Sequence, residues 1–245
     1  MEKIRIEDIL ADLHQVEQQR TLSLGTLAMS QQVAMLKGYQ QQRFANTYAD
    51  LLDNPRYAKA THFFLRELYG PGDFSKRDLQ FARVVPALTK LFPAEVVATV
   101  AKLARLHAIS ETLDMKMAGL LIGGGRISPT AYIGAWQACG QAVQRQAQID
   151  LTIEIGAALD HLTQKPLLRQ ALWMMRVPAS AAGLSEMQIF LEKGFDNFKA
   201  MKGSEQFLLT IRLREEALMK ALFAADADAK WQTSTPPAGP LGQLP

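Results

Sequence analysis

The residues best suited to chemistry lie in one short stretch of the chain, between positions 62 and 78. Six polar or charged side chains there could share a pocket, namely His62, Arg66, Tyr69, Asp73, Arg77 and Asp78. A helix stacks His62, Arg66 and Tyr69 along one face, because they follow one another at i, i+4 and i+7. The other three come after a tight turn and could reach that face. In such a pocket the arginines would hold an anionic ligand, and the histidine or the tyrosine would transfer a proton.

The same stretch has a purely structural interpretation, as a corner between two helices. Gly70 and Pro71 are typical of a helix end. Ser75 is placed to cap the next helix, with Asp78 at the position that completes a capping box. A cluster of salt bridges and caps would therefore explain most of these residue types without any ligand. Both interpretations stay open, although the structural one accounts for more of the residues.

A second candidate group is formed by His107, Glu111 and Asp114, which continue an inward apolar stripe that begins at Val96. This spacing could supply half of a metal site or an acid/base pair. Helical di-metal carboxylate proteins, however, need Glu-x-x-His on two helices, and no histidine here has a glutamate three residues before it. His-Glu-x-x-His is also missing. No metal site is predicted, and His107 is expected to be a core histidine with a carboxylate partner.

Nucleophilic and phosphate-binding motifs give little further support for catalysis. Cys139 has no base near it in the sequence, and Gly-x-Ser-x-Gly does not occur. The turn Gly123–Arg126 precedes a helix, but it lacks the strand and the Gly-Lys-Ser/Thr of a phosphate loop. The sequence identifies no catalytic residue and no cofactor, and it leaves open whether the protein is an enzyme.

The elements that must position these residues are helices throughout. Apolar residues recur with a period of about 3.6 along nearly the whole chain, and no alternating strand pattern occurs. We expect an all-α protein with a single bundle of about eight or nine helices. An N-terminal helical pair over 5–53 and a main bundle over 55–224 form one domain, with one long helix from Ser128 to about Thr163. A Pro/Gly-rich tail over 225–245 is expected to be disordered.

Composition excludes several classes of function. The net charge is only +3, and the basic residues are spread along the chain, which argues against nucleic-acid binding. No apolar run is long enough for a membrane span, and the charged start Met1–Glu7 does not fit a secretory signal. The single cysteine forms no internal disulfide and no Cys-based zinc site. A cytoplasmic location is the simplest expectation.

The segment Phe63–Asp78, FFLRELYGPGDFSKRD, carries a resemblance to a known family. Together with Val84–Leu88 and Leu91–Pro93, it is similar to an uncharacterised family of proteobacterial all-helical proteins. The similarity extends from about Tyr57 to Phe223 and so covers most of the chain. It implies a bacterial cytoplasmic protein, and it assigns no catalytic residues because no activity is settled for that family.

The leading hypothesis is a helical-bundle protein that binds a protein partner or a small anionic or amphipathic ligand. The alternative is a helical haem or metal enzyme resembling the haem-oxygenase-like folds, with His62 or His107 as axial ligand or base. The helix over 27–52 has a polar face rich in glutamine, which would be solvated or would form a homodimer.

Overall fold

The computed structural model describes residues 5–68, 75–233 and 239–245, and in these ranges it contains helices and no strands. The helices are α1 Ile6–Leu24, α2 Leu27–Thr47, α3 Ala49–Asp53, α4 Ala58–Phe63, the π-helix η1 Phe64–Leu68, α5 Ser75–Leu91, α6 Ala94–Leu121, α7 Pro129–Cys139, α8 Ala142–Thr163, α9 Pro166–Met174, α10 Arg176–Ala181, α11 Ser185–Ala200, α12 Glu205–Phe223, α13 Ala227–Thr233 and the 3-10 helix η2 Gly239–Gln243. The predicted all-α class is confirmed.

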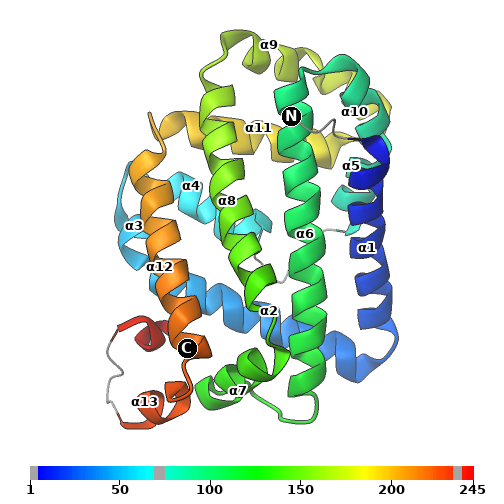
Figure 1. Cartoon of the computed structure of the whole chain (residues 1–245). Helices are drawn as coiled ribbons and strands as arrows, with labels where there is room; N and C mark the ends of the chain where they lie inside the picture. Colours follow the sequence, from blue (N-terminus) through cyan, green and yellow to red (C-terminus); the bar gives the residue numbers. More distant parts are fainter. Residues whose placement is uncertain (1–4, 69–74, 234–238) are drawn as a thin grey trace.

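The longest helix, α6, lies at the centre of the bundle. It packs against α1 on one side and against α8 on the other, and α8 in turn packs against α12 (Figure 1). α2 crosses α6 obliquely, α7 covers one end of the bundle, and α9, α10 and α11 cover the other end (Figure 1). Helices distant in sequence therefore enclose a common interior.

The chain breaks into more helical segments than the eight or nine expected, and the clearest case is the region from Ser128 to Thr163. Ser128 caps α7 as predicted, because its Oγ accepts a hydrogen bond of 3.2 Å from the backbone N–H of Ala131. However, α7 ends at Cys139. Gly140 and Gln141 have positive φ values of 63° and 64°, which are incompatible with a right-handed α-helix. The expected long helix is therefore two helices, α7 and α8.

The apolar core is divided into three clusters. The first lies between α2, α7, α12 and the end of α6, and contains Tyr132 and Leu222. The second joins α1, α5, α11 and the start of α6 around Val85. The third joins α3, α4, α12 and the end of α11 around Phe198 and Phe207. A core divided in this way leaves room for an interior site where the clusters meet.

The C-terminal segment differs from the disordered tail that its composition suggests. α13 lies over 227–233, and η2 follows at the end of the described chain. Leu241 and Leu244 are 5% and 4% exposed and belong to the first core cluster. Asn46 of α2 also donates a hydrogen bond of 3.1 Å to the carbonyl of Gln243. Burial of these leucines supplies the apolar contact that a count of Pro and Gly does not reveal.

The helices α9, α10 and α11 are joined through one carboxylate, Glu192 of α11, which Arg169 of α9 approaches at 3.7 Å. Both oxygens of Glu192 accept hydrogen bonds from Arg176, and Oε1 also accepts one of 2.8 Å from Gln188. The hydrogen bond from Arg176 is the main reason that the pKa of Glu192 falls to about 2. Glu192 therefore stays ionised in the folded protein at pH values where an unfolded chain would protonate it.

We expect Glu192→Gln to destabilise the protein at neutral pH and to have no effect in strong acid. The folded-state pKa is lowered, so the contribution of Glu192 is complete above about pH 4.5 and is lost as the pH falls towards about 2. Urea unfolding of both proteins across this range measures it. Asp196→Asn is the control, because Asp196 pairs with Arg169 but its side chain is 52% exposed. Equal effects of the two substitutions would contradict the assignment.

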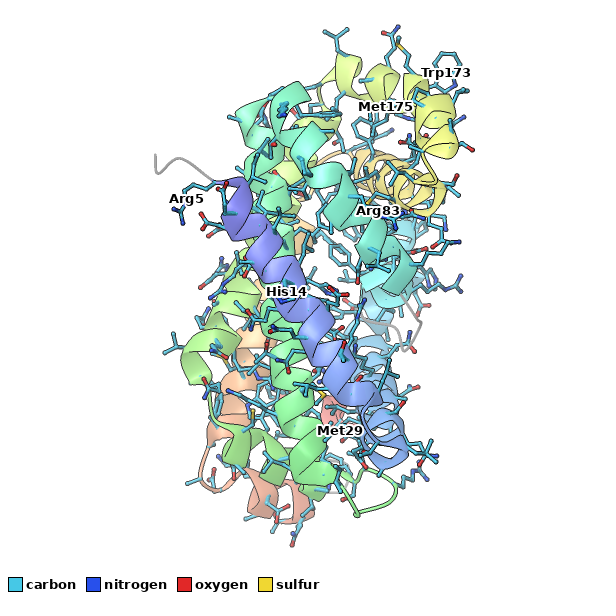
Figure 2. The ribbon with its side chains drawn as sticks, turned by 90° about the vertical axis from the view of Figure 1, so that its right-hand side faces the viewer. Arg5, His14, Met29, Arg83, Trp173 and Met175 are labelled. Atoms are coloured by element: carbon cyan, nitrogen blue, oxygen red, sulfur yellow. The ribbon has the colours of Figure 1, made fainter. Side chains whose placement is uncertain are left out.

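Large apolar side chains are exposed on α9 and α10. Leu167, Trp173, Met174 and Val177 are 77%, 59%, 63% and 79% exposed. Figure 2 shows Trp173 pointing outward at the end of the molecule where α9 lies.

In the described part of the chain, no helix combines the length and the apolar character that crossing a membrane requires.

Candidate functional site

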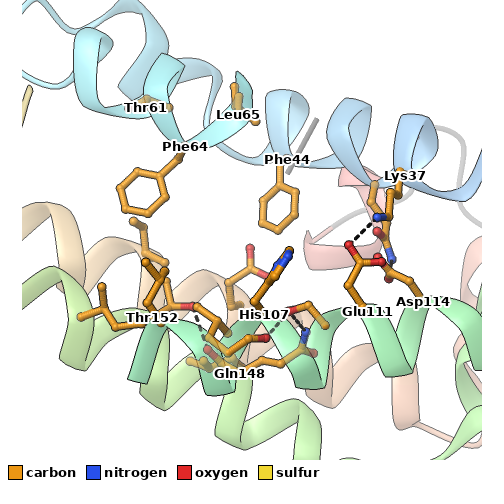
Figure 3. A pocket seen from close by; sticks show the side chains of 18 of the residues that line it. Lys37, Phe44, Thr61, Phe64, Leu65, His107, Glu111, Asp114, Gln148 and Thr152 are labelled. Carbon is orange, nitrogen blue, oxygen red and sulfur yellow. Dashed lines mark hydrogen bonds and ion pairs between the residues drawn. The ribbon is translucent and has the colours of Figure 1, made fainter. Parts of the chain in front are cut away.

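A cavity of about 230 Å³ lies where the three core clusters meet. This volume is somewhat below the range for ligand pockets, which begins at about 300 Å³. Its walls come from α2, α3, α4, α5, α6, α7, α8, α11, α12 and the π-helix η1. Phe44 and Phe64 point into it from α2 and η1, opposite His107 of α6 (Figure 3). π-Helical turns are rare in proteins, and many of those that occur lie at functional sites. This π-helix places Phe64 and Leu65 on the cavity wall.

Asp78 is the centre of a group of charged side chains beside the cavity. Its carboxylate lies 2.5 Å from Nη1 of Arg20 on α1 and 3.0 Å from Nε2 of His107 on α6. Arg77 reaches the other oxygen of Asp78 at 3.5 Å and donates a hydrogen bond to the carbonyl of Glu67. Side chains from α1, α5 and α6 therefore meet at one carboxylate, and His107 has the carboxylate partner that the sequence predicts.

Nε2 of His107 lies between two groups with opposite requirements. Besides Asp78, it lies 3.2 Å from Nη2 of Arg20. Guanidinium groups only donate and carboxylates only accept, so Nε2 can serve only one of them at a time. With a proton it donates to Asp78, and without one it accepts from Arg20. In either state this nitrogen is engaged by protein groups.

Glu111 extends this group by one helical turn of α6. Its Oε1 lies 2.7 Å from Nζ of Lys37 on α2 (Figure 3). The same oxygen lies 3.5 Å from Nη2 of Arg20. We refer to Arg20, Lys37, Asp78, His107 and Glu111 as the charge cluster. Burial favours the neutral carboxylic acids. The hydrogen bond from His107 outweighs burial at Asp78, and the charge of Lys37 outweighs it at Glu111, so the pKa values of both carboxyl groups lie below their ordinary values. Both carboxylates are therefore ionised and satisfied within the cluster.

Asp114, one turn further along α6, is in a different state. Burial raises its pKa, and no cation lies within ion-pair distance of it in the described residues. Gln40 of α2 donates a hydrogen bond of 3.0 Å to its Oδ1. The glutamine-rich face of α2 is thus partly turned inward, and Gln32 of the same helix is only 3% exposed. It is not the wholly solvated face expected from the sequence.

A buried ion pair crosses the cavity wall between α2 and α12. Arg43 is 5% exposed, and its Nη1 lies 2.6 Å from Oε1 of Glu215. Tyr48 donates a hydrogen bond of 2.6 Å to the same oxygen. The guanidinium group also lies 3.6 Å from the ring centroid of Phe44. This pair ties the two helices together where the core is interrupted.

Arg145 of α8 is the other deeply buried arginine on the cavity wall, with 5% exposure. Its Nη1 donates to Gln148 at 3.2 Å, and its Nη2 lies 2.9 Å from the sulfur of Met117. The guanidinium group stacks over the ring of Trp136 at 3.9 Å. These neighbours carry no formal charge, in contrast to the partners of Arg43.

The structure divides the six residues predicted as one pocket into two groups. Arg77 and Asp78 line the cavity. His62 and Arg66 are exposed instead, beside a shallow surface depression that Lys59 and Lys193 also border. Tyr69 and Asp73 lie outside the described residues. The second predicted group, His107, Glu111 and Asp114, lines the same cavity as Asp78. The two groups, separate in sequence, thus contribute to one site.

Several residues of the site were missed from the sequence, namely Arg20, Lys37, Arg43, Arg145 and Glu215. Two of them could have been recognised from the sequence, because each is a charged residue at helical spacing from buried apolar residues. Arg43 lies four residues after Tyr39 and seven after Leu36, both buried. Arg145 lies four residues before buried Ile149. An arginine at such positions is buried with the stripe, and a buried arginine needs a partner.

Fold and site together define an all-α bundle that encloses a cavity with both apolar and charged walls. The chain belongs to the family described as a domain of unknown function, DUF8198, which matches residues 19–229. No curated protein and no solved structure matches the chain.

Proposed function

We propose that this protein binds a small amphipathic anion in the interior cavity. The observation that carries this proposal is the change in the cavity wall along α6 and α8. Val100 and Leu103 of α6 and Ile155 of α8 line one part of it, whereas Asp114 and Arg145 line another. Concave sites lined mainly by apolar side chains, with a few convergent polar groups, are typical of small-molecule binding.

The two helices run antiparallel, which fixes the order of these residues along the cavity. Gln148 of α8 donates to Ser110 of α6 at 2.9 Å, and Arg145 contacts Met117. Polar residues therefore face one another at the α7 end of the cavity, and apolar residues face one another further along. An amphipathic ligand lies along this direction, with its polar group at the α7 end.

The haem or metal enzyme considered from the sequence gains no support from its two histidines. His62 is exposed and does not line the cavity. Nε2 of His107 is engaged by Asp78 and Arg20. Binding without a metal ligand from these nitrogens is therefore the better proposal.

Filling part of the cavity should weaken binding. We expect decanoate to bind the wild-type protein and to raise its Tm, because a ligand that binds only the folded state stabilises it. Leu106→Trp, which adds volume on the cavity wall, should weaken binding by at least about tenfold, a loss of ~1.4 kcal/mol. Isothermal titration calorimetry measures the affinity, and native mass spectrometry of protein from its own host tests for a retained molecule.

Leu120→Trp is the matched control for this experiment. It makes the same change on the same helix, but Leu120 is 51% exposed and does not line the cavity. Its affinity for decanoate should equal that of the wild type. The proposal would be overturned if the wild type bound neither decanoate nor decyl phosphate, or if Leu106→Trp bound the better of these two anions as tightly as Leu120→Trp does.

A further inference from the structure

Arg145 differs from the other arginines and lysines on the cavity wall. Lys37 is paired with Glu111, Arg43 with Glu215, and Arg77 with Asp78. Within the described residues, Arg145 has no carboxylate at ion-pair distance, although it is only 5% exposed. A buried charge without a counter-charge is strongly unfavourable. The cavity therefore contains one cationic group that the described side chains leave without a countercharge in contact.

Two buried donors at this place also have no acceptor. Nε of Arg145 and Nε1 of Trp136 make no hydrogen bond in the described structure. Guanidinium and indole N–H groups can only donate, so each of them requires an acceptor atom nearby. Both side chains line the cavity, and the stacking of Arg145 on the ring of Trp136 holds them together. What is lacking is an acceptor oxygen, and an anionic one would also supply the countercharge.

Asp114 interacts electrostatically with Arg145, but it is not the countercharge in contact with Arg145. It lies beyond ion-pair distance, and its Oδ1 is hydrogen-bonded to Gln40. Burial also raises its pKa, so it is more readily neutral than an ordinary aspartic acid. Asp114 therefore leaves the guanidinium group of Arg145 without a carboxylate in contact.

The cavity also gives room for an apolar chain attached to the anion. Arg145, Gln148, Thr152 and Ile155 follow one another along one face of α8 and all line the cavity. The rise of 1.5 Å per residue places Ile155 about 15 Å from Arg145 along the helix axis. Phe64 and Phe207 lie among the apolar residues of that wall.

We infer that Arg145, assisted by the indole N–H of Trp136, binds the oxyanion head of a single-chain amphiphile, a carboxylate or a phosphate, whose tail lies along α8 towards Ile155. This inference rests on the proposed function and adds the head-group chemistry and the direction in which the ligand lies. Arg145 is a binding residue in this account, and Trp136 is both its support and a second donor.

The test compares decanoate, decyl phosphate and decanol, which share one tail and differ in the head. Wild-type protein should bind at least one of the two anions more tightly than decanol, and the better anion identifies the head group. Arg145→Met should lower the affinity for that anion by roughly tenfold to 100-fold, the range for charge-assisted hydrogen bonds. Its affinity for decanol should change by less than about threefold. Trp136→Phe removes the N–H donor and part of the ring but keeps an aromatic face for Arg145, and it should give a smaller loss for the anion.

A second measurement separates this role from a structural one. Without ligand, Arg145→Met should have an equal or higher Tm than the wild type, because an apolar side chain replaces an unpaired buried charge. A clear fall in Tm would mean that Arg145 supports the fold, and would overturn the inference. Arg212→Met is the control, because Arg212 pairs with Asp150 and Glu216 away from the cavity.

The outcomes distinguish the inference from the proposed function. If wild-type protein binds all three compounds equally, or if Arg145→Met retains wild-type affinity for the anion, the inference fails while the ligand cavity stands. If wild-type protein binds none of them, both the proposed function and the inference fail.

Discussion

Glu215→Leu is expected to lower the free energy of unfolding by about 3–5 kcal/mol, as when one partner of a buried ion pair is removed. Arg43 is 5% exposed, and Glu215 is its only carboxylate at ion-pair distance in the described residues. Burial by itself would lower the pKa of Arg43, but the opposing carboxylate outweighs this effect and raises it. The substitution would therefore leave a charged guanidinium and the hydroxyl of Tyr48 without their shared acceptor.

The double variant Arg43→Met with Glu215→Leu should recover most of this loss, because no unpaired charge is left and apolar side chains fill the space. Asp50→Ala is the surface control. It removes the partner of Arg214, but the side chain of Asp50 is 58% exposed, so the expected cost is at most about 1 kcal/mol. Urea unfolding measures all three variants. A loss for Glu215→Leu no larger than that for Asp50→Ala would contradict the assigned role of the pair.

Local signals in the sequence predicted the fold class and several helix ends correctly. Ser128 and Pro129 begin α7 as expected, and the glycines after Leu121 end α6. The break between α7 and α8 was missed because Gln141 adopts a left-handed backbone conformation, which is uncommon for glutamine and cannot be predicted from its residue type. The order of the C-terminal segment was missed for a related reason. Leu241 and Leu244 are isolated apolar residues, and their burial depends on a surface formed by α2, α7 and α12.

The candidate site could also be predicted only in part from the sequence. Helical spacing correctly placed His107, Glu111 and Asp114 on one inward face of α6. Spacing cannot show which residues of other helices meet that face, however, because this depends on how the helices cross. Asp78 is 29 positions from His107 in the chain and lies 3.0 Å away. Lys37 comes from the helix whose polar face was expected in solvent, yet its side chain is only 23% exposed, and that of Arg20 on α1 is only 20% exposed.

The charge cluster and Arg145 differ in a way that bears on function. In the cluster, each carboxylate has cationic partners, and each cation has a carboxylate, so the charges balance within the protein. At Arg145 they do not balance in the described residues. Fully satisfied buried networks specify a fold, whereas departures from local consistency are expected at functional sites. We therefore assign the cluster to the architecture of the cavity and Arg145 to its ligand.

This division predicts that Asp78→Asn affects stability far more than binding. The loss at pH 7 should be about 3 kcal/mol, because Arg20 and Arg77 both lose the charge that they share, in a site where the Asp78 side chain is 13% exposed. Decanoate affinity should change by less than about threefold, or ~0.7 kcal/mol. Asp12→Asn is the control, because Asp12 of α1 pairs with Arg105 of α6 at a place where the arginine is 55% exposed.

The effect of Asp78→Asn should also depend on pH in one direction. Although burial opposes it, the hydrogen bond from His107, together with the neighbouring arginines, holds the pKa of Asp78 below its ordinary value, so the unfolded chain binds the proton at a higher pH than the folded protein does. The stability difference between wild type and Asp78→Asn is therefore complete near neutral pH and shrinks as the pH falls through the lowered pKa. Urea midpoints between neutral and acidic pH measure it, alongside decanoate titrations at pH 7. If Asp78→Asn kept wild-type stability but lost decanoate binding, Asp78 would belong to the ligand site, and the division between cluster and ligand site would be wrong.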